Sequence, residues 1–317
     1  MFSYLVRRLS AMALMLFGVS LLVFGIMELA PGGPEGIFVA QTMDLQLMGQ
    51  IRHTFGLDQP APIRYAKWLW AALRGDFGRS LTTTGENVNG MIGERLGATV
   101  LLTATSLILA TVVSLMLGVL NGVYRYSWLD HVMTLYAYFG MSFPTFWLGI
   151  MLIWLFSITL GWLPSSGMSE YGREWDIPSR IAHLVLPVFT LAGIWTGIFV
   201  RFLRASIIDV LHQDFIRTAQ SKGLRQRRIF FRHAVRNALI PFVTVVGFEV
   251  PSLIAGSVFV ETIFAWPGVG RLTIQALYRR DYPVIMGVCI VIAFAVILSN
   301  LVVDLAYPLM DPRITYE

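Results

Sequence analysis

The chain alternates between long apolar stretches and shorter segments that hold most of its charged residues. A helix rises 1.5 Å per residue and the hydrocarbon core of a bilayer is about 30 Å thick, so about 20 apolar residues suffice to span it. Six stretches reach this length. We therefore predict an all-α, polytopic membrane protein with six transmembrane helices, at about residues 9–30, 97–123, 132–160, 181–200, 239–261 and 282–305.

Composition supports this fold class. Of the 317 residues, 56% are hydrophobic and only 14% are charged, which excludes a disordered chain and an ordinary cytosolic enzyme. The single cysteine, Cys289, cannot form a disulfide within the chain, which excludes a disulfide scaffold. The first apolar stretch is longer than a signal-peptide core of about 7–15 residues, and no A-x-A site precedes the PGGP breaker at 31–34, so we expect it to remain as an anchor.

The distribution of basic residues predicts the orientation. Lys and Arg collect in cytoplasmic loops, and the segment at 201–236 holds nine of them against two acidic residues. An even number of spans then puts both termini in the cytoplasm, which agrees with the basic pair Arg7 and Arg8. The segment at 31–96, with six basic and six acidic residues, is predicted to lie outside.

Part of this outer segment has helical spacing. Asp44 to Phe55 carries apolar residues at helical intervals, and RYAKWLWAAL at 64–73 is rich in aromatic residues. Trp68 and Trp70 are compatible with two interpretations, anchors at the membrane interface or the core of a small outer domain.

The sequence contains no recognisable catalytic constellation. The five histidines are scattered without an HExxH motif, so we expect no metal site. The chain has neither the G-x-x-x-x-G-K-[ST] string of a nucleotide-phosphate loop nor the G-x-S-x-G string of a serine hydrolase. We therefore predict a non-catalytic chain without a cofactor; if ATP is used, another subunit binds it.

The basic loop at 206–236 is the most informative segment. Its apolar residues recur at helical spacing, then Gly223 marks a bend, and a second helical run follows. An amphipathic helix held by anionic lipid would have this pattern, since each Lys or Arg near such a surface gains about 1 kcal/mol. A docking element for a partner protein would have it as well. Physical chemistry alone leaves both interpretations open.

Sequence motifs favour the second interpretation, a docking element for a partner protein. DFIRTAQSKGL at 214–224 and RHAVRNALIP at 232–241 closely resemble DYVRTARAKGL and RHALRNALLP, which are typical of ABC importer permeases of the dipeptide, oligopeptide and nickel family, in their first-permease or B-type subunit. Further strings of that family occur in order along the chain: APGGP, FGLDQP, RGDFGRSL, SFPTFWLG, LRAS, VETIFAWPGVGRL, RDYPV and NLVVDLAYPLMDPR.

The resemblance implies a type I ABC importer permease fold and a coupling helix that docks on an ATPase subunit. Ala219 and Gly223 stand at the small positions of the family motif, and Arg217 stands where more distant ABC permeases carry Glu. We expect the segment from Asp214 to Arg225 to form the ATPase contact, through Asp214, Arg217, Thr218, Ala219, Lys222, Gly223, Leu224 and Arg225.

The resemblance also implies an organisation and partners. We expect a cytoplasmic end and first helix at 1–30, a periplasmic segment at 31–96, a permease core at 97–310 with the coupling loop at 206–236, and a cytoplasmic tail at 311–317. The implied partners are a second homologous permease, two subunits that bind ATP and Mg, a periplasmic or surface-tethered substrate-binding protein, and membrane lipids. The implied cargo is a di- or oligopeptide, with nickel, glutathione, opines and oligosaccharides as alternatives.

Glu249 is the acidic residue nearest the middle of a predicted span. Burying a charge there costs about 2.5–3.5 kcal/mol, so we expect it to face either a water-filled pathway, where it would bind a cation or a peptide amine, or a partner helix. Glu28, Glu261 and Asp304 lie near span ends, where we expect contact with water. Pro144, Pro187 and Pro251 are predicted to interrupt the third, fourth and fifth spans.

The stretch FAWPGVG at 264–270 is predicted to lie in an outer loop. By resemblance it belongs to the face that meets the binding protein; alternatively, it is a plain re-entrant turn with Trp266 as an interfacial anchor.

Other functions fit the sequence less well. A stand-alone secondary transporter predicts inverted repeats, which the sequence does not show. A membrane-embedded enzyme predicts a cluster of acids or histidines at one membrane face. Nucleic-acid binding is not expected, because the topology already accounts for the basic loop.

Overall fold

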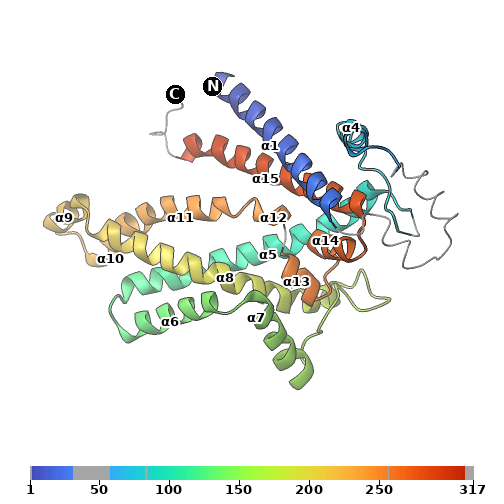
Figure 1. The fold of residues 1–317 in the computed structure, drawn as a ribbon. Helices are drawn as coiled ribbons and strands as arrows, with labels where there is room; N and C mark the ends of the chain where they lie inside the picture. Colours follow the sequence, from blue (N-terminus) through green and yellow to red (C-terminus); the bar gives the residue numbers. More distant parts are fainter. Residues whose placement is uncertain (1, 31–57, 83–84, 256, 311–317) are drawn as a thin grey trace.

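The computed structural model describes residues 2–30, 58–82, 85–255 and 257–310. Within these ranges the chain forms helices and connecting segments and no β-strand, which confirms the all-α prediction (Figure 1). The predicted helical stretch at 44–55 lies outside the described residues. Five helices in the described ranges are long and apolar enough to cross a membrane: Val6–Leu29, Val88–Val123, Ile177–Leu211, Gln226–Phe248 and Tyr282–Val303.

The third predicted span is not one helix. It divides into α6 (Trp128–Ser142) and α7 (Thr145–Leu152), and the π-helix η1 (Ile153–Thr159) continues α7. Phe143 and Pro144 between them are extended, because proline has no N–H to continue the helix and disfavours helical geometry in the residue before it. The prediction that Pro144 interrupts the third span is therefore confirmed, and this span consists of more than one helix.

The fifth predicted span has different bounds. A continuous run of α10 (Gln226–Arg228), the π-helix η2 (Ile229–Val235) and α11 (Arg236–Phe248) replaces the span predicted at 239–261. The helix ends at Phe248, three residues before Pro251, and is followed by α12 (Ser252–Ala255) and α13 (Val258–Ile263). Glu249 is therefore the C-terminal cap of α11 and not a mid-span residue.

Pro187, unlike Pro144, does not interrupt its helix. Pro187 lies inside the unbroken helix α8 (Ile177–Leu211), so the prediction that it interrupts the fourth span is wrong.

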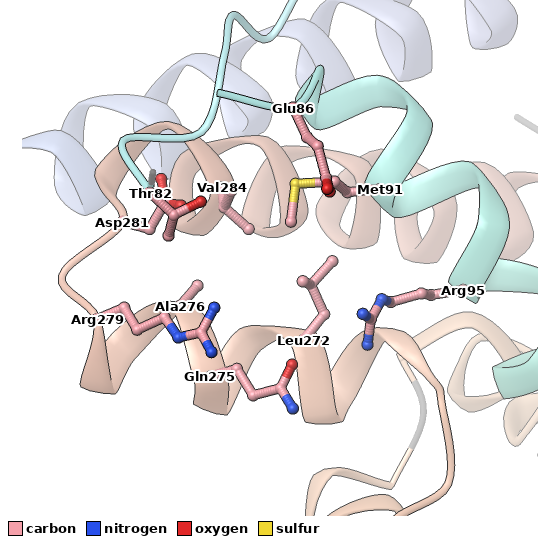
Figure 2. Close-up of a pocket in the computed structure, with 10 residues that line it drawn as sticks. All are labelled: Thr82, Glu86, Met91, Arg95, Leu272, Gln275, Ala276, Arg279, Asp281 and Val284. Atoms are coloured by element: carbon pink, nitrogen blue, oxygen red, sulfur yellow. The ribbon is translucent and has the colours of Figure 1, made fainter. Parts of the chain in front are cut away.

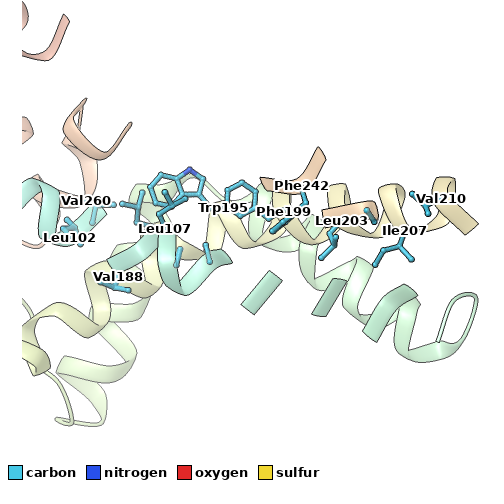
Figure 3. Packing of buried hydrophobic residues seen from close by; sticks show 14 of the residues in the cluster. Leu102, Leu107, Val188, Trp195, Phe199, Leu203, Ile207, Val210, Phe242 and Val260 are labelled. Carbon is cyan, nitrogen blue, oxygen red and sulfur yellow. The ribbon is translucent and has the colours of Figure 1, made fainter. Parts of the chain in front are cut away.

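Helices α5 (Val88–Val123) and α8 are the centre of the molecule. At 36 and 35 residues each is about 50 Å long, well beyond the thickness of a hydrocarbon core. They pack in direct contact, because a Cβ atom on Gly118 would lie 2.8 Å from Leu203 Cδ2 and one on Gly122 would lie 2.8 Å from Ile207 Cγ2. Figure 3 shows the apolar side chains along this contact. The fully buried members include Leu102, Phe199, Leu203 and Ile207.

The bundle has two distinct ends (Figure 1). At one end lie the start of α1 (Phe2–Leu29), the end of α15 (Tyr282–Met310), the turn between α5 and α6, and the short helix α9 (Asp214–Ser221). At the other lie α4 (Ala61–Ala72), α13 and α14 (Val269–Tyr278). We call these the α9 end and the α14 end.

The aromatic residues of α4 attach it to α1. The Tyr65 hydroxyl lies 2.7 Å from Ser20 Oγ, and its ring lies 5.2 Å from that of Phe24. The Trp68 ring stacks against Tyr65, whereas Trp70 is 60% exposed and carries Arg74 over its face. Trp68 therefore contributes to packing and Trp70 does not.

Candidate functional site

The predicted ATPase contact, Asp214 to Arg225, begins with the eight-residue helix α9, which follows α8 closely. Only His212 and Gln213 separate the end of α8 from α9, so the two helices are connected by a short linker. Gly223 ends the segment with a φ of +74°, a backbone conformation that residues with a Cβ atom rarely adopt. No atom lies within 4 Å of the position its Cβ would take, so the glycine is required by the turn and not by close packing.

The eight predicted contact residues divide into two groups. Ala219 is buried and Leu224 is half-buried, and both belong to or pack against the main hydrophobic core with Ile216. Ala219 and Leu224 therefore pack the segment against its own chain, and we do not assign them to the contact with a partner. The other six lie on the exposed surface: Asp214, Arg217, Thr218, Lys222, Gly223 and Arg225.

Two exposed aromatic residues extend this surface. Helical spacing assigns Phe215 to the apolar face, yet it is 39% exposed. Phe231 is 49% exposed, with Arg227 over its ring at 6.0 Å, and it lines a shallow pocket with three arginines, Arg225, Arg227 and Arg228. An apolar ring amid exposed charges is typical of a protein contact surface.

The charges on α9 are weakly engaged within the chain. Arg217 lies 3.4 Å from Asp214, and both side chains are mostly exposed. Exposed pairs of this kind contribute about 0–1 kcal/mol, so these groups are free to interact with another subunit.

A buried ion pair joins two helices near the α9 end. Arg204 of α8 donates from Nε to Asp130 Oδ1 and from its terminal nitrogen to Oδ2, both at 2.7 Å. The backbone N–H of Tyr126 donates to the same carboxylate at 2.9 Å. The Asp130 side chain is only 3% exposed. Sequence analysis missed this pair, since 74 residues separate its members and neither belongs to a recognisable site motif.

Glu249 lies near the middle of the bundle. Trp195, about halfway along α8, donates its indole N–H to Glu249 Oε2 at 3.1 Å. The carboxylate is half-buried, and the adjacent Phe248 is 59% exposed at the surface of the chain. The group therefore lies about halfway along α8, next to an exposed aromatic side chain.

Glu261 is fully buried at the α14 end, so the prediction that it contacts water is wrong. Thr99 Oγ1 of α5 donates to Oε1 at 2.9 Å, and the backbone N–H of Arg271 donates to Oε2 at 3.0 Å. Burial raises the pKa of the Glu261 carboxyl, and these hydrogen bonds act in the opposite direction. A Cβ atom on Gly268 would lie 2.4 Å from the carboxyl group, which explains the glycine there.

Trp266 reinforces the same junction. It is fully buried and donates its indole N–H to the carbonyl oxygen of Ala98 at 2.8 Å. The alternative in which Trp266 is an interfacial anchor is therefore wrong.

A second buried carboxylate connects the outer segment to the bundle. Asp281 accepts hydrogen bonds from Ser80 Oγ and from the backbone N–H of Leu81, at 3.1 Å for the latter. The motifs RGDFGRSL and RDYPV thus meet at one carboxylate, although 201 residues separate Ser80 from Asp281.

A polar pocket lies beside Asp281 (Figure 2). The guanidinium groups of Arg95 and Arg279 extend toward it from opposite sides, with Gln275 between them. In the described part of the chain, neither arginine has an ion-pair partner. The pocket is lined by Thr82, Glu86, Met91, Arg95, Leu272, Gln275, Ala276, Arg279, Asp281 and Val284.

Among the described residues, no three His, Cys, Asp or Glu side chains are grouped so that they could hold a metal ion. The arrangement has an exposed charged surface at one end, a half-buried carboxylate about halfway along α8, and a polar pocket at the other end.

Comparison with known proteins gives consistent matches over the whole length. Residues 110–316 match the family described as "binding-protein-dependent transport system inner membrane component", and residues 1–103 match its N-terminal counterpart. The oligopeptide transport system permease protein AppB of Bacillus subtilis is 40% identical over 316 residues, covering 100% of both chains. The glutathione transport system permease protein GsiC of Escherichia coli K12 is 37% identical over 317 residues, again covering 100% of both.

One solved structure shares the fold. The crystal structure of an amino acid ABC transporter with histidines aligns with a TM-score of 0.53 and 18% identity, covering 71% of this chain and 94% of that one.

Proposed function

We propose a function from one premise: the chain belongs to the family of binding-protein-dependent transport system inner membrane components. It is a permease of an ABC importer and a multi-pass inner-membrane protein, and as a transport component it carries out no catalysis. From this premise we infer that it forms half of a translocation path for small peptides. Relatives named for oligopeptide and glutathione transport, both peptide cargoes, support this substrate class.

The proposed assembly contains a second homologous permease, two subunits that bind ATP with Mg and hydrolyse it, and a substrate-binding protein. The absence of a nucleotide-phosphate loop from the sequence supports ATP hydrolysis elsewhere. Large apolar side chains exposed on the bundle, such as Phe189 and Phe248, support contact with another membrane subunit or with lipid.

The observation that carries the proposal is the α9 surface. Six exposed residues of the predicted contact lie on α9 and in the turn after it, and α9 follows α8, one of the two long central helices of the bundle. Movement of a docked ATPase would therefore act directly on α8. The start of α1, with Arg7 and Arg8, lies at the same end, which supports a cytoplasmic position for this end and for both termini (Figure 1).

Glu249 is the proposed pathway residue of this chain. A carboxylate at mid-depth cannot face lipid tails without a cost of about 2.5–3.5 kcal/mol. A water-filled path between two permeases would remove that cost, and the carboxylate would then meet the passing cargo.

The α14 end is the proposed contact for the binding protein. The pocket between Arg95 and Arg279 offers two guanidinium groups to an acidic side chain, a pairing that gives directional, charge-assisted hydrogen bonds. The fixed FAWPGVG turn lies at the same end of the bundle.

Gly223→Asp tests the docking assignment. The variant should insert normally but lose most of the ATPase subunit that co-purifies with the permease, together with uptake. Gly172→Asp is the matched control, because Gly172 also has a positive φ, +77°, is exposed, and has no atom within 4 Å of its Cβ position, yet lies outside the α9 surface. Undiminished ATPase association and uptake in Gly223→Asp would refute the assignment.

A further inference from the structure

The ion pair between Asp130 and Arg204 lies where α8 approaches α9. Arg204 is seven residues before the end of α8 at Leu211, which is about 10 Å along the helix axis. Asp130 stands in the first turn of α6. The pair therefore links the helix that carries α9 to the next helix of the bundle.

One carboxylate holds three elements at this point. Asp130 accepts two hydrogen bonds from Arg204 of α8 and one from the backbone of Tyr126 in the turn that leads from α5. Its own backbone N–H is capped by Ser127 Oγ at 3.3 Å. Tyr126 has a φ of +63°, an unusual conformation for a residue with a side chain, which this hydrogen bond helps to hold. The α5–α6 turn, the start of α6 and α8 therefore share one anchor.

Stability alone does not explain a buried ion pair. Packed apolar side chains of similar volume are often as stabilising, because removing two charges from water offsets most of their attraction. A paired, two-hydrogen-bond contact between Arg and a carboxylate does impose one geometry. Among the described residues, no other ion pair joins α6 to α8. The cation–π contact of Arg201 with Tyr138, at 5.8 Å, is on the exposed side of the same contact.

The far end of α6 meets α7 at a helix break, where the Phe143 ring stacks on Trp147 of α7 at 4.5 Å. The helix stops at Ser142, and Phe143 and Pro144 interrupt it before α7 begins. Helix α7 packs against the first half of α8 and against the residue after α13, because a Cβ atom on its Gly149 would lie 3.5 Å from Thr190 of α8 and 3.2 Å from Phe264. Residues that end one element and begin another commonly absorb changes in the angle between the two elements.

We propose that Asp130 and Arg204 are positioning residues for coupling: their paired hydrogen bonds make α6 follow α8 when a docked ATPase moves α9. The movement of α6 then extends to the break at Phe143 and Pro144, where the angle between α6 and α7 changes. This inference rests on the proposed docking of an ATPase at α9.

The test uses the complete transporter in proteoliposomes with its binding protein loaded with alanylalanine. In a Cys289→Ala background, Asp130→Cys combined with Arg204→Cys removes the ion pair and allows it to be replaced by a short, reducible bis-methanethiosulfonate cross-link. The readouts are basal ATP hydrolysis, its stimulation by the loaded binding protein, and dipeptide uptake per ATP hydrolysed.

We expect uptake per ATP to fall at least tenfold without the cross-link, while basal hydrolysis and ATPase association stay within twofold of the parent. Cross-linking should restore at least half of the coupling, and reduction should remove it again. The matched control replaces the exposed pair Glu170 and Arg173 by cysteines, which should change coupling in neither state. Arg204→Lys, which keeps the charge but not the paired geometry, should give an intermediate loss and serves as the test if the double variant does not assemble.

Parental coupling without the ion pair would overturn the inference, as would a cross-link that restores thermal stability but not coupling, or Arg204→Lys that couples like the parent. If the proposed function itself were wrong, the results would differ from these. The parent transporter would then show no stimulation of ATP hydrolysis by the loaded binding protein, or the ATPase subunit would still co-purify when Gly223 is replaced by Asp.

Discussion

The two ends of the bundle satisfy their charged groups in opposite ways. At the α14 end, the carboxylates of Glu261 and Asp281 are buried and accept hydrogen bonds from backbone N–H and hydroxyl groups of the same chain. The α9 end has one buried ion pair and, apart from it, a surface of exposed arginines with exposed Phe215 and Phe231. The buried carboxylates of the α14 end therefore have their hydrogen-bond partners within the chain, whereas the charged groups of the α9 surface, like Arg95 and Arg279 in the pocket at the α14 end, are available to a partner.

This difference indicates where substitutions should act on folding and where they should act on assembly. Buried groups of the α14 end hold together segments that are far apart in sequence, so substitutions there should lower the free energy of unfolding. Exposed groups of the α9 end contribute little to the stability of the fold, so substitutions there should weaken the binding of another subunit.

The largest expected effect is that of Glu261→Ala. It leaves two buried donors, Thr99 Oγ1 and the Arg271 N–H, without their acceptor, at about 1–3 kcal/mol each, so the free energy of unfolding should fall by about 2–6 kcal/mol. Unfolding in mixed micelles would measure it. Glu249→Ala is the control, since that carboxylate is half-buried and accepts one side-chain hydrogen bond; its cost should be about 1 kcal/mol. Equal losses in the two variants would remove the distinction.

Gly268→Ala should be the next most harmful change. The added methyl group would lie 2.4 Å from the Glu261 carboxyl, and overpacking of this kind costs about 1–3 kcal/mol. Gly97→Ala, with no atom within 4 Å, should leave the melting temperature unchanged or raise it slightly. If Gly268→Ala were as stable as Gly97→Ala, the tight packing around Glu261 would be disproved.

Stability should also depend on pH through Glu261. Because burial raises its pKa in the folded state above that in the unfolded state, folding is favoured at low pH and loses this contribution as pH rises from about 4.5, the reference value, through the folded pKa. Glu261→Gln should flatten this part of the profile relative to the parent. The difference between two unfolding series across pH 4.5 to 8 measures it; identical slopes would contradict the assignment.

The smallest effect on stability should come from Arg217→Ala. Its side chain is exposed and its pairing with Asp214 is weak, so the free energy of unfolding should change by less than about 0.5 kcal/mol. ATPase association should nevertheless fall several-fold, measured by co-purification. Arg173→Ala, also exposed and paired with Glu170, should alter neither quantity. A stability loss without a loss of association would reverse the proposed role of the α9 end.

The apolar pattern predicted the fold class and most spans, but not where helices end. Hydropathy measures the length of an apolar run, whereas the breaks at Pro144 and near Pro251 depend on a missing N–H at one position. Pro187 has the same chemistry and leaves α8 unbroken, so proline alone did not decide the outcome. The packing around each proline is tertiary information.

The candidate site was predictable to a similar extent. Motif resemblance placed the α9 segment correctly on a short helix, but Ala219 and Leu224 pack inward and Phe215 faces outward. The partners of Asp130, Glu261 and Asp281 lie 74, 162 and 201 residues away, beyond the reach of any local pattern.

Labelling of two single cysteines tests the central claim most directly. In a Cys289→Ala background, Arg217→Cys reports on the α9 end and Arg173→Cys on the opposite end, and both positions are exposed. With a membrane-impermeant maleimide on intact cells, position 173 should react and position 217 should not; in inverted vesicles, position 217 should react only after the ATPase subunits are stripped away. Reaction of position 217 in intact cells, or its full reactivity with the ATPase bound, would contradict the account.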